Sequence, residues 1–216
     1  MAHSFQSRPV DSYLARLSEM REFGGDALTV GVSDEDIRDF IESGYEELAE
    51  AIERAYECFE KMQDTHPDFL ALDEDSQVTQ AHEGLTNFYA EDAVNPYVAA
   101  GASGPWLVTL KGAVVYDCGG YGMLGLGHAP VAVLEAMDKP HVMANIMTAN
   151  ISMMDFIACL RDEVGHNRKG GTPYPSFLCL NSGSEAMSIA SRITDINTGD
   201  LTAEGARYEG REVRGL

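Results

Sequence analysis

Two serines and a glycine between an apolar run and a helical pattern are the residues of this chain best suited to chemistry. The apolar residues 177–180 end at Asn181, and Ser182, Gly183 and Ser184 follow directly before the helical pattern. The first N–H groups of a helix have no partner inside the helix, and the helix dipole favours negative charge there. Gly183 allows the backbone to approach a ligand closely, and the serine hydroxyls add hydrogen-bond donors. The pattern predicts an anion site with a phosphate group as its natural ligand.

The elements that position this site are a predicted strand over residues 177–180 and a predicted helix over residues 184–197. The helix has a face of small apolar residues that suits packing under a sheet. A hairpin is predicted over residues 107–117, where apolar runs flank Lys111 and Gly112. Further helices are predicted over residues 131–137 and 153–164, and a short one over residues 81–89.

The N-terminal part of the chain is acidic and carries a strong helical pattern. The net charge is −20, and residues 1–100 contribute −17 of it. Ser33 and Asp36 have the spacing of a capping box, and the apolar spacing that follows predicts one amphipathic helix over residues 34–62, which Gly44 weakens or bends. We expect this helix to serve packing, and the acidic surface to exclude nucleic acid and anionic membranes as partners.

The composition gives a prediction of location and argues against metal binding. No apolar run is long enough to cross a bilayer, and the first residues lack the apolar core of a signal peptide, so we expect a cytoplasmic protein. The four cysteines have neither C-x-x-C spacing nor the spacing of zinc ligands, and we expect them to be buried as small apolar residues. They are Cys58, Cys118, Cys159 and Cys179.

Two blocks of the sequence resemble a known family. Residues 181–186, Asn-Ser-Gly-Ser-Glu-Ala, followed by a helix, resemble the phosphate-binding motif of class-III aminotransferases. These are pyridoxal-phosphate enzymes of the ornithine, acetylornithine and 4-aminobutyrate aminotransferase group. Residues 114–131 resemble that family's segment of a strand, an aspartate, a glycine-rich turn and Gly-His-x-Pro. The resemblance covers residues 95–200.

The resemblance implies an α/β fold, the fold-type-I architecture of pyridoxal-phosphate transferases, present here incompletely. It divides the chain into an acidic helical region (1–94), a small-domain and interface segment (95–170), and the start of the cofactor-binding large domain (171–216). It implies that Ser182, Gly183 and Ser184 hold the phosphate of pyridoxal 5′-phosphate. The implied activity transfers an amino group between a small-molecule amino donor and a 2-oxo acid, in a protein that is a homodimer at full length.

The catalytic residues of the family have no counterpart in this sequence. In the family a lysine far beyond the phosphate-binding motif forms the Schiff base, and an aspartate pairs with the pyridine nitrogen. All four lysines here precede Ser184, and Asp195 and Asp200 lie in or just after the motif's own helix. We therefore expect an inactive N-terminal portion of a longer enzyme. The four lysines are Lys61, Lys111, Lys139 and Lys169.

Three alternatives remain open at this point. A non-catalytic binding or regulatory protein could keep the same motif. Residues 120–125 match G-x-G-x-x-G, which would suit a dinucleotide-dependent oxidoreductase, but Pro130 follows too soon for the helix that this fingerprint needs. Ser182 and Ser184 lack the G-x-S-x-G context of a hydrolase nucleophile. For His128, a hydrogen-bonded structural role is favoured over a catalytic base.

Overall fold

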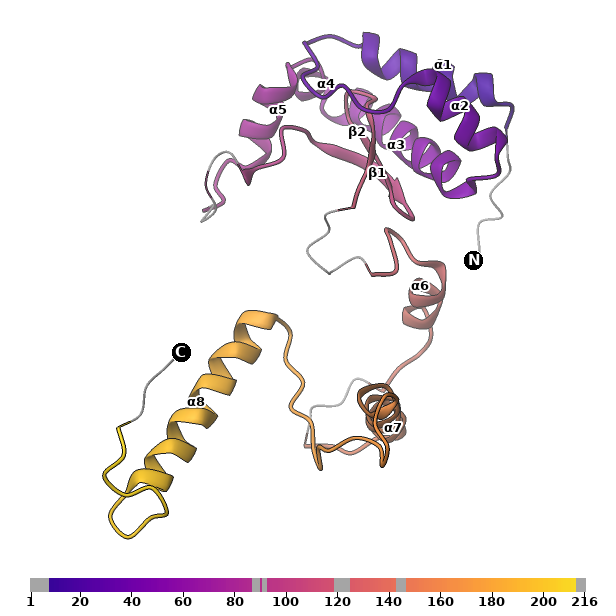
Figure 1. The fold of residues 1–216 in the computed structure, drawn as a ribbon. Coiled ribbons are helices and arrows are strands. Elements are labelled where there is room, and N and C mark those ends of the chain that lie inside the picture. The colour runs from indigo at the N-terminus through magenta and orange to yellow at the C-terminus, as the bar shows by residue number, and fades with distance from the viewer. Residues whose placement is uncertain (1–7, 87–89, 91–92, 119–124, 143–146, 213–216) are drawn as a thin grey trace. The chain divides into compact units, whose positions relative to one another are not determined.

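A computed structural model describes the chain except residues 1–7, 87–89, 91–92, 119–124, 143–146 and 213–216. The chain divides into two compact units, Met1–Pro140 and His141–Leu216. The predicted boundaries fall elsewhere, after residues 94 and 170. The first unit extends past residue 94 because its helices and its sheet share one hydrophobic core. Figure 1 labels the helices of both units.

The first unit consists of helices packed on a small antiparallel sheet. Its elements in chain order are α1 (Val10–Glu22), α2 (Asp34–Glu42), α3 (Glu46–Thr65), α4 (Pro67–Leu70), α5 (Glu74–Ala81), β1 (Ala99–Ser103), β2 (Trp106–Thr109), β3 (Val114–Tyr116) and α6 (Val131–Met137). The strand order is β1-β2-β3. Helix α3 packs on β1 and β2, and α1 and α2 pack on α3 (Figure 1).

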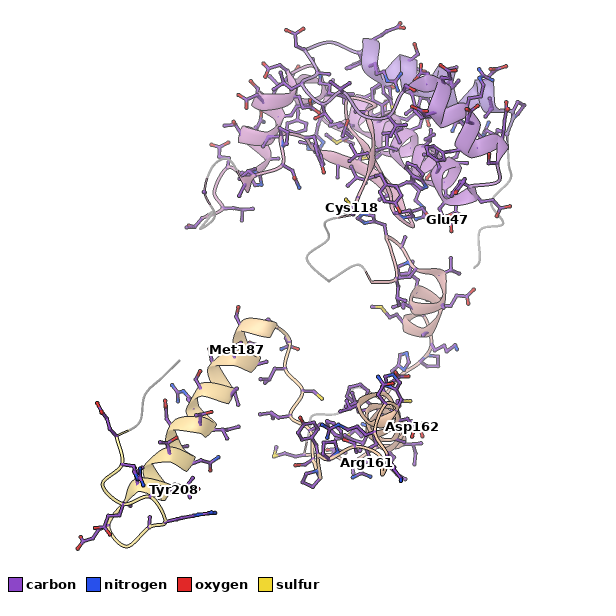
Figure 2. The ribbon with its side chains drawn as sticks, in the orientation of Figure 1. Glu47, Cys118, Arg161, Asp162, Met187 and Tyr208 are labelled. Atoms are coloured by element: carbon purple, nitrogen blue, oxygen red, sulfur yellow. The ribbon has the colours of Figure 1, made fainter. Side chains whose placement is uncertain are left out.

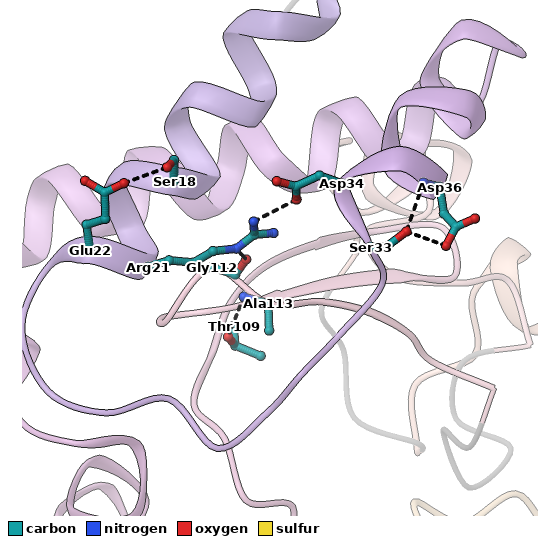
Figure 3. Close-up of polar contacts among 9 residues, drawn as sticks. All are labelled: Ser18, Arg21, Glu22, Ser33, Asp34, Asp36, Thr109, Gly112 and Ala113. Atoms are coloured by element: carbon teal, nitrogen blue, oxygen red, sulfur yellow. Dashed lines mark hydrogen bonds and ion pairs between the residues drawn. The ribbon is translucent and has the colours of Figure 1, made fainter.

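The single helix predicted over residues 34–62 is two helices, so that prediction is wrong. Its start is as predicted, because the Ser33 hydroxyl accepts a hydrogen bond from the Asp36 N–H at 3.2 Å (Figure 3). Helix α2 ends where Gly44 adopts a φ of 92°, which a residue with a side chain rarely adopts. The Tyr45 N–H then donates to the Phe40 carbonyl, and the two rings pack edge to face at 5.4 Å. This is a Schellman motif with its hydrophobic contact, and it ends the helix.

Helix α5 lies before the position predicted for it. It spans Glu74–Ala81, and Asp73 caps it by accepting from the Ser76 N–H at 2.8 Å. The chain turns after Ala81, and Gly84 has a φ of 83°. The prediction over residues 81–89 is therefore wrong for residues 82–86, and residues 87–89 lie outside the described part of the chain.

The predicted hairpin is confirmed. Strands β2 and β3 pair antiparallel, with Trp106 opposite Tyr116 and Val108 opposite Val114. The Gly112 N–H donates to the Thr109 carbonyl at 2.9 Å, and Gly112 has a φ of 73°. This is a three-residue hairpin loop with glycine in the left-handed position. Figure 3 shows the loop beside Arg21, whose Nε donates to the Gly112 carbonyl at 3.0 Å.

The contact between α3 and β1 depends on the absence of a side chain at Gly101. A Cβ added at Gly101 would lie 2.3 Å from the backbone nitrogen of Ala55. Small residues on α3, among them Ala51 and Ala55, are fully buried against the strand. The large side chains of the core include Tyr13, Leu17, Met20, Ile37, Leu48, Ile52, Phe59 and Trp106.

The described residues of the second unit form two helices, α7 (Ile151–Gly165) and α8 (Gly183–Thr202). Both predicted helices are confirmed, and each extends beyond its predicted ends. The predicted strand over residues 177–180 is wrong, because these residues are irregular and have no strand partner in the described part of the chain. Apolar side chains of this unit are exposed, including Leu178 and Met187. Figure 2 labels Met187 on the last helix of the unit. The fold-type-I architecture is built mainly on a parallel sheet. That this chain belongs to it stays a prediction.

The structure bears on two further expectations, the burial of the cysteines and the absence of a membrane-spanning helix. Cys118, Cys159 and Cys179 are exposed and Cys58 is half-buried, so the expected burial of the cysteines is wrong. None of the four belongs to the hydrophobic core of the first unit. Among the described residues, no helix has the length and apolarity that crossing a membrane requires.

Candidate phosphate-binding site

Ser182, Gly183 and Ser184 lie together at the start of α8, as predicted. Ser182 is the N-cap residue, with φ −145° and ψ 156°, and its hydroxyl accepts from the Glu185 N–H at 3.2 Å. Its carbonyl accepts the first helical hydrogen bond, from the Ala186 N–H at 3.1 Å. Gly183 and Ser184 are therefore the first two helical residues, and Ser182 fixes where the helix begins.

Three hydrogen-bond donors at this helix start are available to a ligand. The N–H groups of Gly183 and Ser184 and the Ser184 hydroxyl have no partner among the described residues. Both residues are exposed, and a Cβ added at Gly183 would meet no atom of the described residues within 4 Å. Two backbone donors, one hydroxyl and the positive end of the helix dipole match the oxygen acceptors and the charge of a phosphate.

One charged side chain at the site opposes an anion. The Glu185 carboxylate turns back and accepts a hydrogen bond from the Asn181 N–H at 3.1 Å. The Ser182 hydroxyl and the Glu185 carboxylate therefore each accept from a backbone N–H at the helix start, an arrangement related to the capping box. The spacing of Glu185 from Ser182 is the sequence signal for such a cap. The carboxylate places negative charge at the same helix end, so a bound phosphate experiences repulsion from it.

The second family-like block, residues 114–131, lies in the first unit. Asp117 directly follows β3, and its Oδ2 is 3.0 Å from His128 Nε2. The backbone groups of His128 exchange two hydrogen bonds with Gly104, at 2.7 and 3.0 Å. His128 is thus hydrogen-bonded on its ring and on its backbone, as its structural interpretation predicted. Of the G-x-G-x-x-G pattern at 120–125, all but Gly125 lies outside the described residues.

A pocket of about 550 Å³ lies in the first unit beside this block. Glu46, Glu47 and Glu50 line one part of it, and the residues from Leu126 to Val133 that line another part are mostly apolar. A neighbouring pocket of about 350 Å³ includes Asp117, His128 and Glu47. The acidic lining disfavours an anion there, so these pockets do not compete with the start of α8 as a phosphate site. Neither pocket was predicted from the sequence, because the walls of each pocket come from segments that are far apart in the chain.

Comparison with known proteins found no matching family model, no matching curated protein and no matching solved structure. The two motifs and the geometry at the start of α8 are therefore the features of this chain that indicate a function.

Proposed function

We propose that this chain forms the phosphate-binding part of a pyridoxal-phosphate-dependent aminotransferase of the class-III type. The reaction of such an enzyme moves an amino group between an amine or amino acid and a 2-oxo acid. The observation that carries the proposal is the pair of N–H groups at Gly183 and Ser184, in an open helix start, that have no partner among the residues the structure describes. The resemblance of residues 181–186 and 114–131 to the family supplies the identity of the ligand.

Each residue at the start of α8 has a distinct task in this proposal. The Gly183 and Ser184 N–H groups donate to phosphate oxygens, and the Ser184 hydroxyl adds a third donor. Ser182 holds the helix start in place through its bond to the Glu185 N–H. When bound, pyridoxal 5′-phosphate supplies the electron sink for bond cleavage at the amino-bearing carbon.

The proposed role of the given chain is binding without turnover. No lysine follows Ser184 in the sequence, and Asp195 and Asp200 belong to α8 itself. We propose that the segment from residue 95 to residue 170 contributes to the small domain and to the interface of a homodimer, as it does in the family.

A binding titration tests the proposal directly. Pyridoxamine 5′-phosphate is the probe, because its amine cannot attach covalently to lysine side chains, and pyridoxamine is the matched control without phosphate. Calorimetry on the full chain should show binding of the first and none of the second at equal concentration. Equal binding of the two compounds, or binding of a nicotinamide nucleotide in their place, would contradict the proposal.

A turnover assay tests the second half of the proposal. The chain is incubated with pyridoxal 5′-phosphate, an amino donor and a 2-oxo acid, and the new amino acid is quantified. We expect none above the level of the cofactor alone. Measured turnover would show that a lysine before Ser184 performs the chemistry, and the role without turnover would then be wrong.

A further inference from the structure

Three buried polar side chains and the half-buried Thr29 form a cluster in the first unit, well apart in sequence from the candidate phosphate site at residues 182–184. Glu74 and Gln77 are fully buried on consecutive turns of α5, and Lys111 at the hairpin tip is 2% exposed. Thr29 belongs to the cluster because its N–H donates to Glu74 Oε2 at 2.7 Å. We call these residues the Lys111 cluster.

Hydrogen bonds within the first unit hold three of these side chains in place. The second oxygen of the Glu74 carboxylate, Oε2, also accepts from the Leu28 N–H at 2.6 Å. The amide nitrogen of Gln77 donates to the Leu70 carbonyl at 3.1 Å, and the Lys111 ammonium donates to the same carbonyl at 3.3 Å. Gln77 and Lys111 therefore meet at one acceptor, and the charges of Glu74 and Lys111 act on each other.

Three oxygens of the Lys111 cluster are buried without a hydrogen-bond partner among the described residues. They are Glu74 Oε1, Gln77 Oε1 and Thr29 Oγ1. The Lys111 ammonium has three N–H donors and uses two of them, on Leu70 and Gly24. A buried polar atom without a partner costs about 1–3 kcal/mol, so several such atoms in one small region require a common explanation.

We infer that the Lys111 cluster binds one internal water molecule that bridges Glu74, Gln77 and Lys111. A water donates two hydrogen bonds, which satisfy Glu74 Oε1 and Gln77 Oε1, and it accepts from the remaining Lys111 N–H or from the Thr29 hydroxyl. Buried waters in proteins make about three hydrogen bonds to polar groups of this kind. A metal cation or an ammonium ion fits the same oxygens less well, because the Lys111 charge repels it.

Oxygen-17 magnetic relaxation dispersion on the full chain tests the inference, because it counts whole water molecules that stay longer than the protein's tumbling time. Gln77→Met removes one acceptor of the proposed water at similar side-chain length. Gln80→Met makes the same change at an exposed position of α5. We expect the amplitude to fall by one water in Gln77→Met and to stay unchanged in Gln80→Met. Equal amplitudes in the two variants would overturn the inference.

Crystallography of the unmodified chain decides the matter if Gln77→Met does not fold. We expect a density peak at about 3 Å from both Glu74 Oε1 and Gln77 Oε1. The absence of a peak there would overturn the inference. An anomalous signal at this position after rubidium soaking would also overturn it, because the ligand would then be a monovalent cation.

Discussion

Replacing Gly183 by proline removes one proposed phosphate donor while keeping the helix start. Proline has no N–H and is favoured at the first helical position, where the N–H has no partner inside the helix. Ser182, which would precede the proline, already has the extended backbone that proline requires of its neighbour, with ψ 156°. A Cβ at Gly183 meets nothing within 4 Å, so the substitution creates no close contact at that atom.

The expected loss of affinity follows from the single donor that disappears. A hydrogen bond to a charged group contributes about 1.5–3 kcal/mol, which corresponds to a Kd about 10- to 160-fold higher. The free energy of unfolding should stay the same or rise by up to about 1 kcal/mol, because proline restricts the unfolded chain. Binding should therefore weaken without any loss of stability, which general damage to the helix could not produce.

Calorimetric titration with pyridoxamine 5′-phosphate measures the Kd, and circular dichroism confirms that helix content is kept. Gly183→Ala is the matched control, because it adds a methyl group in the same open space and retains the N–H. We expect Gly183→Ala to lose less affinity than Gly183→Pro, since it keeps the donor that the proline variant lacks. Equal affinity in Gly183→Pro and Gly183→Ala would refute the assignment of this N–H to the phosphate.

Three other predictions concern charge, packing and pH. Glu185→Gln should tighten binding of pyridoxamine 5′-phosphate about two- to fivefold in the same titration, because a carboxylate at this helix end repels the ligand; an unchanged Kd would refute the repulsion. Gly101→Ala should lower the free energy of urea unfolding by about 1–3 kcal/mol, since its Cβ would lie 2.3 Å from a backbone nitrogen of α3. Gly125→Ala, where a Cβ meets nothing within 4 Å, is the control that should cost less. The hydrogen bond to Glu19, with burial, raises the pKa of Tyr56 to about 12 from 10.0, so the stability that this bond supplies is complete below pH 10 and is lost as the pH rises from 10 to 12. Tyr56→Phe should remove this loss, about 1 kcal/mol after solvent screening, in unfolding curves recorded across that range.

Local signals in the sequence predicted some elements of the fold well. The helices at 131–137 and 153–164 and the hairpin around Lys111 depend on short-range patterns, and the structure confirms them. The break between α2 and α3 escaped prediction because the apolar spacing continues through it, and only the left-handed backbone of Gly44 ends the helix. Over residues 177–180, by contrast, the sequence predicted a strand that the structure does not form. An apolar run becomes a strand only where a partner strand exists.

The start of α8 was predictable, and its surroundings were only partly so. The order of Ser182, Gly183 and a helical pattern suffices to place the helix start, because N-capping is local. The contact between Asp117 and His128 was not predicted, since the two residues are eleven positions apart with a glycine-rich stretch between them. Their pairing depends on how the chain returns to Gly104, which no local pattern specifies.

The position of Lys111 has a consequence for where this protein tolerates changes in chain length. Hairpin tips are usually where insertions, tags and protease-cleavage sites are accepted, because they project into solvent. Here the tip residue is 2% exposed and bonded to carbonyls of Gly24 and Leu70. Adding or deleting one residue between Thr109 and Ala113 would displace a charged group from the interior, so this connection is as constrained as a core position.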